Sequence, residues 1–212
     1  MKIKWLGHAC FKLTAEDGTT IVTDPFDDSV GYPMPDVRAD IVTSSHSHFD
    51  HNYFKAVKGK FEIVDRTGEH NIKGIKIKGI STFHDEEQGA KRGKNIVFVF
   101  EIDGVRVCHM GDLGHVLTEK QVNEIGSVDV LLIPVGGYYT IDAKQAVEVM
   151  KQLNPKITIP MHYKTEYIDF PIDTVDNFLK LTNGEQIPSS ELEVKKEELE
   201  GQTKVIALTF QK

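Results

Sequence analysis

The sequence predicts a layered α/β protein, with strands in the interior and polar loops at their carboxyl ends. Short apolar runs rich in β-branched residues recur along the 212 residues, which indicates buried strands. Clusters containing His and Asp directly follow several of these runs, and site residues on loops at strand ends are typical of layered α/β proteins. Two segments with helical spacing fit the outer layers.

The strands can be placed in chain order. Residues 1–6 alternate between apolar and charged side chains, as a half-buried strand does. The segments 20–23 and 40–44 are apolar and β-branched in their middle, so they are expected to be buried. By the same pattern, later strands are expected at 74–80, 104–108, 156–160 and 205–210.

Helices are predicted at roughly 118–125 and 142–153. Thr118 is a favoured N-cap residue, and Ala143, Ala146, Val147 and Met150 recur at helical spacing. A further helix is expected to start in the segment 52–57, with Asp50 or Asn52 as its cap. The polar segment 183–204 is expected to form a solvated loop and a short strand.

The motif H-x-H-x-D-H follows the strand at 40–44. It consists of His46, His48, Asp50 and His51, within the sequence SHSHFDH. Neutral imidazole is the commonest metal ligand among side chains, and carboxylate oxygen complements it on hard or borderline cations. Only 9 His occur in 212 residues, so this density is not expected by chance. One metal does not need four ligands so closely spaced, and two metal ions are therefore expected.

A strand followed by H-x-H-x-D-H resembles the metallo-β-lactamase superfamily. Three further segments carry the resemblance: His84 in STFHDEE, Asp112 in CHMGDLG and His162 in IPMHYKT, each after an apolar β run. The resemblance covers nearly the whole chain. It implies a four-layer αββα sandwich and a single domain over residues 1–212.

The resemblance also implies a ligand set for two divalent metal ions. His46, His48 and His84 would hold the first ion, Asp50, His51 and His162 the second, and Asp112 would bridge them. A carboxylate between two cations roughly 3.5–4 Å apart offsets their repulsion, and a hydroxide trapped there is a nucleophile at neutral pH. Because all seven ligands offer nitrogen or oxygen and none is a thiolate, Zn²⁺, Mn²⁺ and Fe are admissible. Zinc is favoured.

Four shorter segments resemble a narrower branch, the one that contains the L-ascorbate-6-phosphate lactonases. They are GHACF at 7–11, TDP at 23–25, PVGG at 134–137 and PMHY at 160–163. The leading hypothesis is a dinuclear metal-dependent hydrolase of a small ester, lactone or phosphoester. A bridging hydroxide would attack, and Asp112 and Asp50 would be the catalytic residues, Asp50 as proton acceptor or carrier.

Two alternatives remain open. Mononuclear-iron dioxygenases of sulfur compounds share this fold and keep the H-x-H-x-D-H motif, so the motif does not exclude them. The third hypothesis is a non-catalytic, metal-stabilised domain that binds a ligand. A complete ligand set argues against it.

Five polar residues are candidates for the second coordination sphere or for substrate binding. His8 would contact the metals or substrate, or would be a buried hydrogen-bonded histidine. Asp24 would orient a ligating histidine or start a turn. His115 is a candidate proton shuttle or a surface loop histidine. Lys164 and Arg92 are candidates for binding a substrate carboxylate or phosphate, or are solvated surface charges.

Composition sets the remaining expectations. The net charge of -7 offers no electrostatic footprint for nucleic acid, so the expected partner is a small-molecule substrate. No apolar run approaches 18 residues, which argues against a membrane span, and the N-terminal segment lacks an apolar signal core, which favours the cytoplasm. Cys10 and Cys108 are expected to be buried and reduced. The sequence does not predict the oligomeric state.

Overall fold

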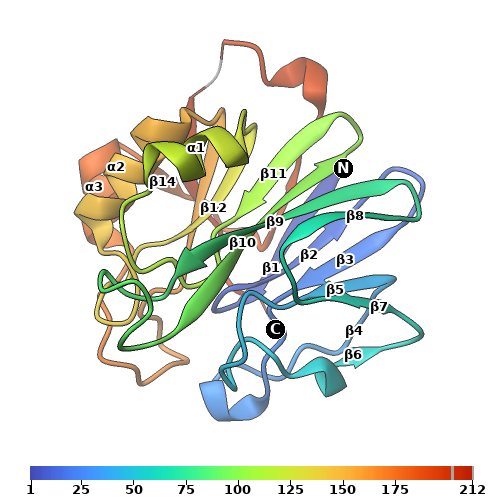
Figure 1. Cartoon of the computed structure of the whole chain (residues 1–212), viewed down its shortest axis with the longest axis horizontal. Helices are drawn as coiled ribbons and strands as arrows, with labels where there is room; N and C mark the ends of the chain where they lie inside the picture. The colour runs from blue at the N-terminus through green and yellow to red at the C-terminus, as the bar shows by residue number, and fades with distance from the viewer. Residues whose placement is uncertain (202, 212) are drawn as a thin grey trace.

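Two mixed β-sheets form the interior of the protein in the computed structural model, which describes residues 1–201 and 203–211 (Figure 1). The smaller sheet has the strand order β15-β1-β2-β3-β5-β7. The larger has the order β14-β16-β13-β12-β11-β10-β9-β8. One continuous core of buried apolar side chains joins residues of both sheets. The expected metallo-β-lactamase-type sandwich is therefore confirmed.

The strand bounds follow the apolar runs of the sequence. The smaller sheet contains β1 (Lys2–Gly7), β2 (Cys10–Thr14), β3 (Thr20–Thr23), β5 (Ile41–Thr43), β7 (Glu62–Val64) and β15 (Glu191–Glu193). The larger contains β8 (Gly68–Ile72), β9 (Ile75–Phe83), β10 (Lys94–Ile102), β11 (Val105–His109), β12 (Val130–Pro134), β13 (Ile157–Met161), β14 (Glu185–Gln186) and β16 (Lys204–Ala207). A separate two-stranded sheet pairs β4 (Val37–Arg38) with β6 (Val57–Lys58).

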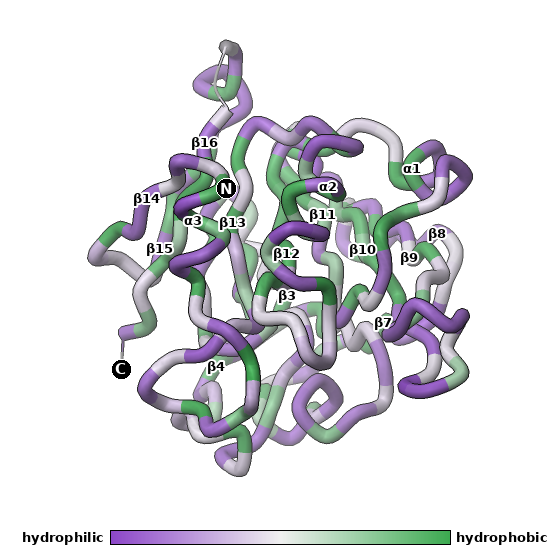
Figure 2. The backbone as a smooth tube through the Cα atoms, turned by 90° about the vertical axis from the view of Figure 1, so that its left-hand side faces the viewer, coloured by the Kyte–Doolittle hydropathy of each residue, from purple (hydrophilic) through white to green (hydrophobic). Residues whose placement is uncertain are grey.

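The central strands of the larger sheet are apolar on both faces. Every residue of β12 and of β13 is buried. Strands covered on both sides read as continuous apolar runs rather than as alternating ones, which explains why these segments lack a polar face. In Figure 2, β12 is mostly green (hydrophobic), whereas long purple (hydrophilic) stretches lie in the peripheral loops.

Three α-helices contact strands of the larger sheet. They are α1 (Glu119–Ile125) against β9, α2 (Ala143–Leu153) against β12, and α3 (Asp176–Thr182) against β16, and they gather at one side in Figure 1. The helices α1 and α2 begin with complete capping boxes, in which the side chains of Thr118 and Asp142 accept backbone hydrogen bonds. The two predicted helices are thus confirmed, and the cap expected at Thr118 is present.

Two sequence-based expectations about secondary structure were wrong, and one helix was missed. The segment 52–57 does not start an α-helix: it forms a 3-10 turn, Phe54–Ala56, and continues into β6, whose pairing with β4 requires an extended chain. The helix α3 was not predicted, although Asn183 in the left-handed conformation ends it. The last strand ends at Ala207, because the chain beyond it hydrogen-bonds to the loop at 187–189.

Parallel pairing brings the site loops to one edge of the sheets. The strands β11, β12, β13 and β16 run parallel, as do β3, β5 and β7. The loops after β3, β5, β11 and β13 carry Asp24, the H-x-H-x-D-H motif, Asp112 and His162. The carboxyl ends of parallel strands lie together, so these loops meet.

One smaller expectation, on the two cysteines, is also met. Cys10 and Cys108 are both buried and free. Among the described residues, no helix combines the length and the apolar character that crossing a membrane requires.

Candidate metal centre

The Asp112 carboxylate lies at the centre of the predicted ligands. Its Oδ2 atom is 3.1 Å from Nε2 of His84, 3.2 Å from that of His51, 3.3 Å from that of His162 and 3.9 Å from that of His46. These four histidines come from three different loops. One buried carboxylate oxygen therefore faces imidazole nitrogens from both predicted metal sites.

The predicted ligands other than Asp112 form two groups of donor atoms, and within each group the donors are within 4.8 Å of one another. The first group consists of His46, His48 and His84. The second consists of Asp50, His51, His162 and His8. Asp112 forms a third such group with His46 from the first and His51 from the second. The structure thus brings all seven predicted ligands together in the predicted division, and it adds His8 to the second group.

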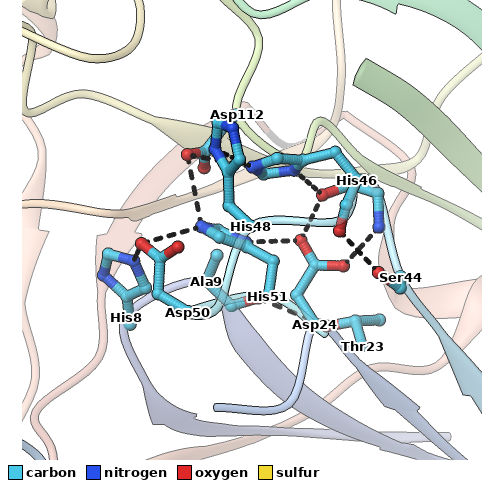
Figure 3. Close-up of polar contacts among 12 residues, drawn as sticks. His8, Ala9, Thr23, Asp24, Ser44, His46, His48, Asp50, His51 and Asp112 are labelled. Atoms are coloured by element: carbon cyan, nitrogen blue, oxygen red, sulfur yellow. Dashed lines mark hydrogen bonds and ion pairs between the residues drawn. The ribbon is translucent and has the colours of Figure 1, made fainter. Parts of the chain in front are cut away.

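The side chain of Asp24 contacts the second group directly, at His51, and the first group through Ser45, at His46. Its Oδ2 accepts a 2.9 Å hydrogen bond from Nδ1 of His51 (Figure 3). The same oxygen accepts a 2.6 Å hydrogen bond from Oγ of Ser45. Ser45 Oγ also lies 2.9 Å from Nδ1 of His46. Because the Ser45 hydroxyl donates its hydrogen to Asp24, its oxygen accepts a hydrogen bond from the Nδ1–H group of His46. Both imidazoles are then protonated at Nδ1, so their Nε2 atoms are left to bind a metal.

His8 is fully buried and lies against the second group. Its Nε2 is 3.1 Å from Oδ2 of Asp50, and its ring centroid is 4.2 Å from that of His162. Its backbone is in the left-handed region with a φ of 51°, and its carbonyl accepts hydrogen bonds from Trp5 Nε1 and from the His162 amide. The Gly-His-Ala turn therefore carries His8 to the Asp50 carboxylate and joins it to the His162 loop.

The protonation states suit cation binding. Burial and then repulsion by His51 lower the pKa of His46 to about 3. Burial opposes ionisation of Asp112, yet His162 and His51 hold the pKa of that carboxyl well below its ordinary value. Burial would also lower the pKa of His51, but Asp112 and Asp50 raise it well above its ordinary value. The ionised Asp112 carboxylate therefore favours positive charge, and a metal bound at His51 would take the place of the proton on that imidazole.

Two orphaned atoms also fit a bound metal. His51 Nε2 and Asp112 Oδ1 are buried without a hydrogen-bond partner among the described residues. Buried polar atoms are ordinarily satisfied, because an unpaired one costs about 1–3 kcal/mol. The donors are imidazoles and carboxylates, which ligate divalent cations through deprotonated nitrogen and oxygen atoms.

A cavity of about 620 Å³ opens onto the ligands. His48, Asp50, His84, Asp112 and His162 line its floor, and its walls include Phe49, Arg92, Tyr139 and Phe170. Its size is that of a small-molecule site, and its walls are largely aromatic.

The other predicted residues lie in different places. Arg92 lines the cavity, as described above. His115 accepts a hydrogen bond from the Phe83 amide at Nε2 and lies 2.8 Å from the Val116 carbonyl at Nδ1, so both ring nitrogens are engaged by backbone. The Lys164 amine is bound by Asp169 and by the Phe170 carbonyl, and Lys164 is not among the described residues that line the cavity. These contacts engage the polar atoms of both side chains, and the predicted roles of His115 and Lys164 at the site stay predictions.

Two supporting residues were missed in the sequence. Ser45 links Asp24 to His46 through hydrogen bonds of its hydroxyl group, and its position next to the motif was the one sign of this role in the sequence. Asp85 is buried, and its carboxylate accepts hydrogen bonds from four backbone amides in the loop 87–92. Asp85 therefore fixes the loop that presents Arg92.

Replacement of His8 by alanine is expected to weaken binding at the second metal site. Asp50 loses the group that orients it, and loss of such an outer-sphere partner costs about 10–100-fold in metal affinity. Competition with a chromophoric chelator measures both affinities, and His8→Gln, which retains a hydrogen-bond donor, is the matched control. Unchanged affinities in His8→Ala would show that His8 only packs against the site.

Known proteins resemble this chain in sequence or in fold to different degrees. A family model described as a beta-lactamase superfamily domain matches residues 2–162. A UPF0173 metal-dependent hydrolase from Thermoplasma volcanium is 34% identical over 196 residues, covering 78% of this chain and 84% of that protein. A crystal structure from Thermotoga maritima, described as a candidate Zn-dependent hydrolase of the metallo-beta-lactamase superfamily, is 52% identical with a TM-score of 0.83 and covers 98% of this chain and 97% of that one. Isothiocyanate hydrolase from Delia radicum gut bacteria has a TM-score of 0.69 at 15% identity, covering 98% and 96% of the two chains, a similarity of fold alone.

Proposed function

We propose a reaction for this chain, which belongs to the metallo-β-lactamase superfamily and, within it, to the UPF0173 metal-dependent hydrolases. The reaction is hydrolysis of a small ester, lactone or phosphoester at a centre of two divalent metal ions. The observation that carries this proposal is the position of Asp112 Oδ2, within 3.1–3.9 Å of Nε2 atoms from both ligand groups. A carboxylate so placed is suited to bridging two cations and fixing their separation.

Each of the two ligand groups would hold one metal ion next to Asp112. His46, His48 and His84 would hold one ion, and Asp50, His51 and His162 the other. When bound, two such ions supply Lewis acidity and a nucleophilic hydroxide near neutral pH. Asp24 keeps His51 in the ligating tautomer directly and His46 through Ser45, so the chain itself holds both sites ready.

The cavity residues bind and orient the substrate. Asp50 lines the cavity as a carboxylate, since His51 and His8 hold its pKa below its ordinary value despite its burial. It can accept a hydrogen bond from a water or an alcohol in the cavity and carry a proton away. Phe49, Tyr139 and Phe170 exclude water from the walls and contact the apolar part of the substrate.

Zinc is the metal that we favour, with manganese or iron as alternatives, because every donor is nitrogen or oxygen. Lactone hydrolysis is the activity to screen first, because the segments 7–11, 23–25, 134–137 and 160–163 resemble the branch that contains the L-ascorbate-6-phosphate lactonases. The small cavity supports a small-molecule substrate rather than a polymer.

The test is a hydrolysis screen of the protein loaded with zinc or with manganese. The panel contains simple esters, γ- and δ-lactones and bis(4-nitrophenyl) phosphate, and oxygen uptake on a persulfide is measured in parallel. Turnover of at least one hydrolytic class that is lost after chelation and restored by the metal supports the proposal. Oxygen uptake with one bound iron and no hydrolysis would contradict it.

A further inference from the structure

A second hollow borders the metal centre on the side of His46 and His48. It is a cleft of about 570 Å³, lined by the loop 45–48, by Arg66 and Thr67, and by the segment 92–94. It shares Ser47, His48 and Arg92 with the cavity over the ligands. A small molecule bound at the metals can therefore reach the cleft past His48.

The charged side chains that line this cleft, apart from its histidines, are all positive. They are Arg66, Arg92 and Lys94, and no carboxylate is among the lining residues. The adjoining cavity adds only Asp50 and Asp112 as acidic residues, both of them predicted ligands. Such a cluster is not expected from composition, because the chain has 32 acidic and 25 basic residues.

The three cations of this basic cleft also lack internal counterions. Within the described part of the chain, none of the ion pairs formed by lysine or arginine involves Arg66, Arg92 or Lys94. By contrast, Lys91, next to Arg92 in the sequence, pairs with Glu87. Positive charges that line one cleft without a carboxylate to pair with repel each other, and a bound anion would relieve that repulsion.

Arg92 is held in place rather than left free. Its backbone amide donates a 2.7 Å hydrogen bond to the buried Asp85 carboxylate. Its guanidinium lies 5.6 Å from the centre of the Tyr139 ring, which is a cation–π distance. Arg92 is therefore pre-positioned between the cavity and the basic cleft.

We infer that the basic cleft binds an anionic group, a carboxylate or a phosphate, on the substrate that is hydrolysed at the Asp112 centre. The inference rests on the proposed function and narrows its substrate class. The anionic group would lie among Arg66, Arg92 and Lys94, with the scissile bond over the ligands and an apolar part against Tyr139 and Phe170. Guanidinium groups are suited to both anions, since they bind either one with paired hydrogen bonds.

The first experiment measures anion binding without catalysis. Inorganic phosphate and succinate are titrated calorimetrically into the zinc-loaded protein and into the triple variant Arg66→Gln, Arg92→Gln, Lys94→Gln. We expect the triple variant to bind the preferred anion at least about tenfold more weakly, since charge-assisted hydrogen bonds are lost. Lys91→Gln is the matched control on the same loop and should bind like the wild type, and Arg92→Gln alone keeps the test valid if the triple variant is unstable.

Equal anion affinities in the wild type and the triple variant would overturn the inference, because the anions would then bind at the metals alone. Tighter binding of phosphate than of succinate in the wild type points to a phosphorylated substrate, and the reverse order points to a carboxylate.

The second experiment uses 4-nitrophenyl butyrate and its charged counterpart, mono-4-nitrophenyl succinate. The wild type should show a higher kcat/KM on the charged ester than on the neutral one, and in the triple variant the ratio of the two kcat/KM values should fall toward one. If the metal-loaded wild type hydrolyses no member of the full screen, the proposed function fails, and the titrations still decide whether the basic cleft binds anions. A preference that persists in the triple variant would overturn the inference alone.

Discussion

Replacing Asp112 with alanine is expected to remove at least one of the two metal ions and to lower hydrolysis by at least about a hundredfold. Asp112 Oδ2 faces Nε2 atoms from both ligand groups, so without it two cations would repel each other with no anion between them. Elemental mass spectrometry of the purified variant gives the metal content, and kcat on the best substrate of the screen gives the activity.

The control for this variant is Asp36→Ala, which removes an exposed carboxylate that pairs with Lys58. It should retain metal and activity at the wild-type level. If Asp112→Ala also retained both in full, Asp112 would not be the bridging ligand and the proposed mechanism would be wrong.

Replacing Asp24 with alanine is expected to destabilise the protein by about 3–5 kcal/mol, the usual cost of removing one partner of a buried charged pair. Asp24 is fully buried, and its carboxylate receives the Ser45 amide, the Ser45 hydroxyl and the His51 imidazole. Its loss leaves three buried donors without an acceptor. Urea denaturation of the metal-free protein measures the change in the free energy of unfolding.

The same variant should also bind metal more weakly at both sites, because Asp24 sets the tautomers of His51 and, through Ser45, of His46. Asp24→Asn keeps one acceptor oxygen and should lose less stability than Asp24→Ala. A wild-type urea midpoint together with wild-type metal affinities in Asp24→Ala would refute this role.

The ligand set was predictable from sequence because each ligand follows an apolar strand and sits in a recognisable segment. Those strands form as expected, and parallel pairing places Asp112 and His162 at the same edge as the His46 loop. The sequence also allowed the prediction that Asp24 orients a ligating histidine, because Asp24 directly follows a buried strand. Its link to both metal sites depends on Ser45, and nothing in the spacing of the sequence indicates that contact.

The surroundings of the site were less predictable because they depend on how distant loops pack. Arg66 and Lys94 are remote from the motif in sequence, and only the packing of the β7 and β10 ends against the loop 45–48 brings them to one cleft. Lys164 was an equally good candidate for binding an anion by its place near His162. In the structure, the Lys164 ammonium group forms an ion pair with Asp169 instead. Such choices between partners are set by tertiary contacts rather than by local sequence.

The central claim is a centre of two metals bridged by Asp112, and metal stoichiometry tests it most directly. The protein would be purified without chelator, supplemented with zinc or manganese, desalted and measured by elemental mass spectrometry alongside Asp112→Ala. The structure predicts about two ions per chain in the wild type, from the two donor groups that Asp112 faces. One iron per chain, or no metal after supplementation, would contradict it.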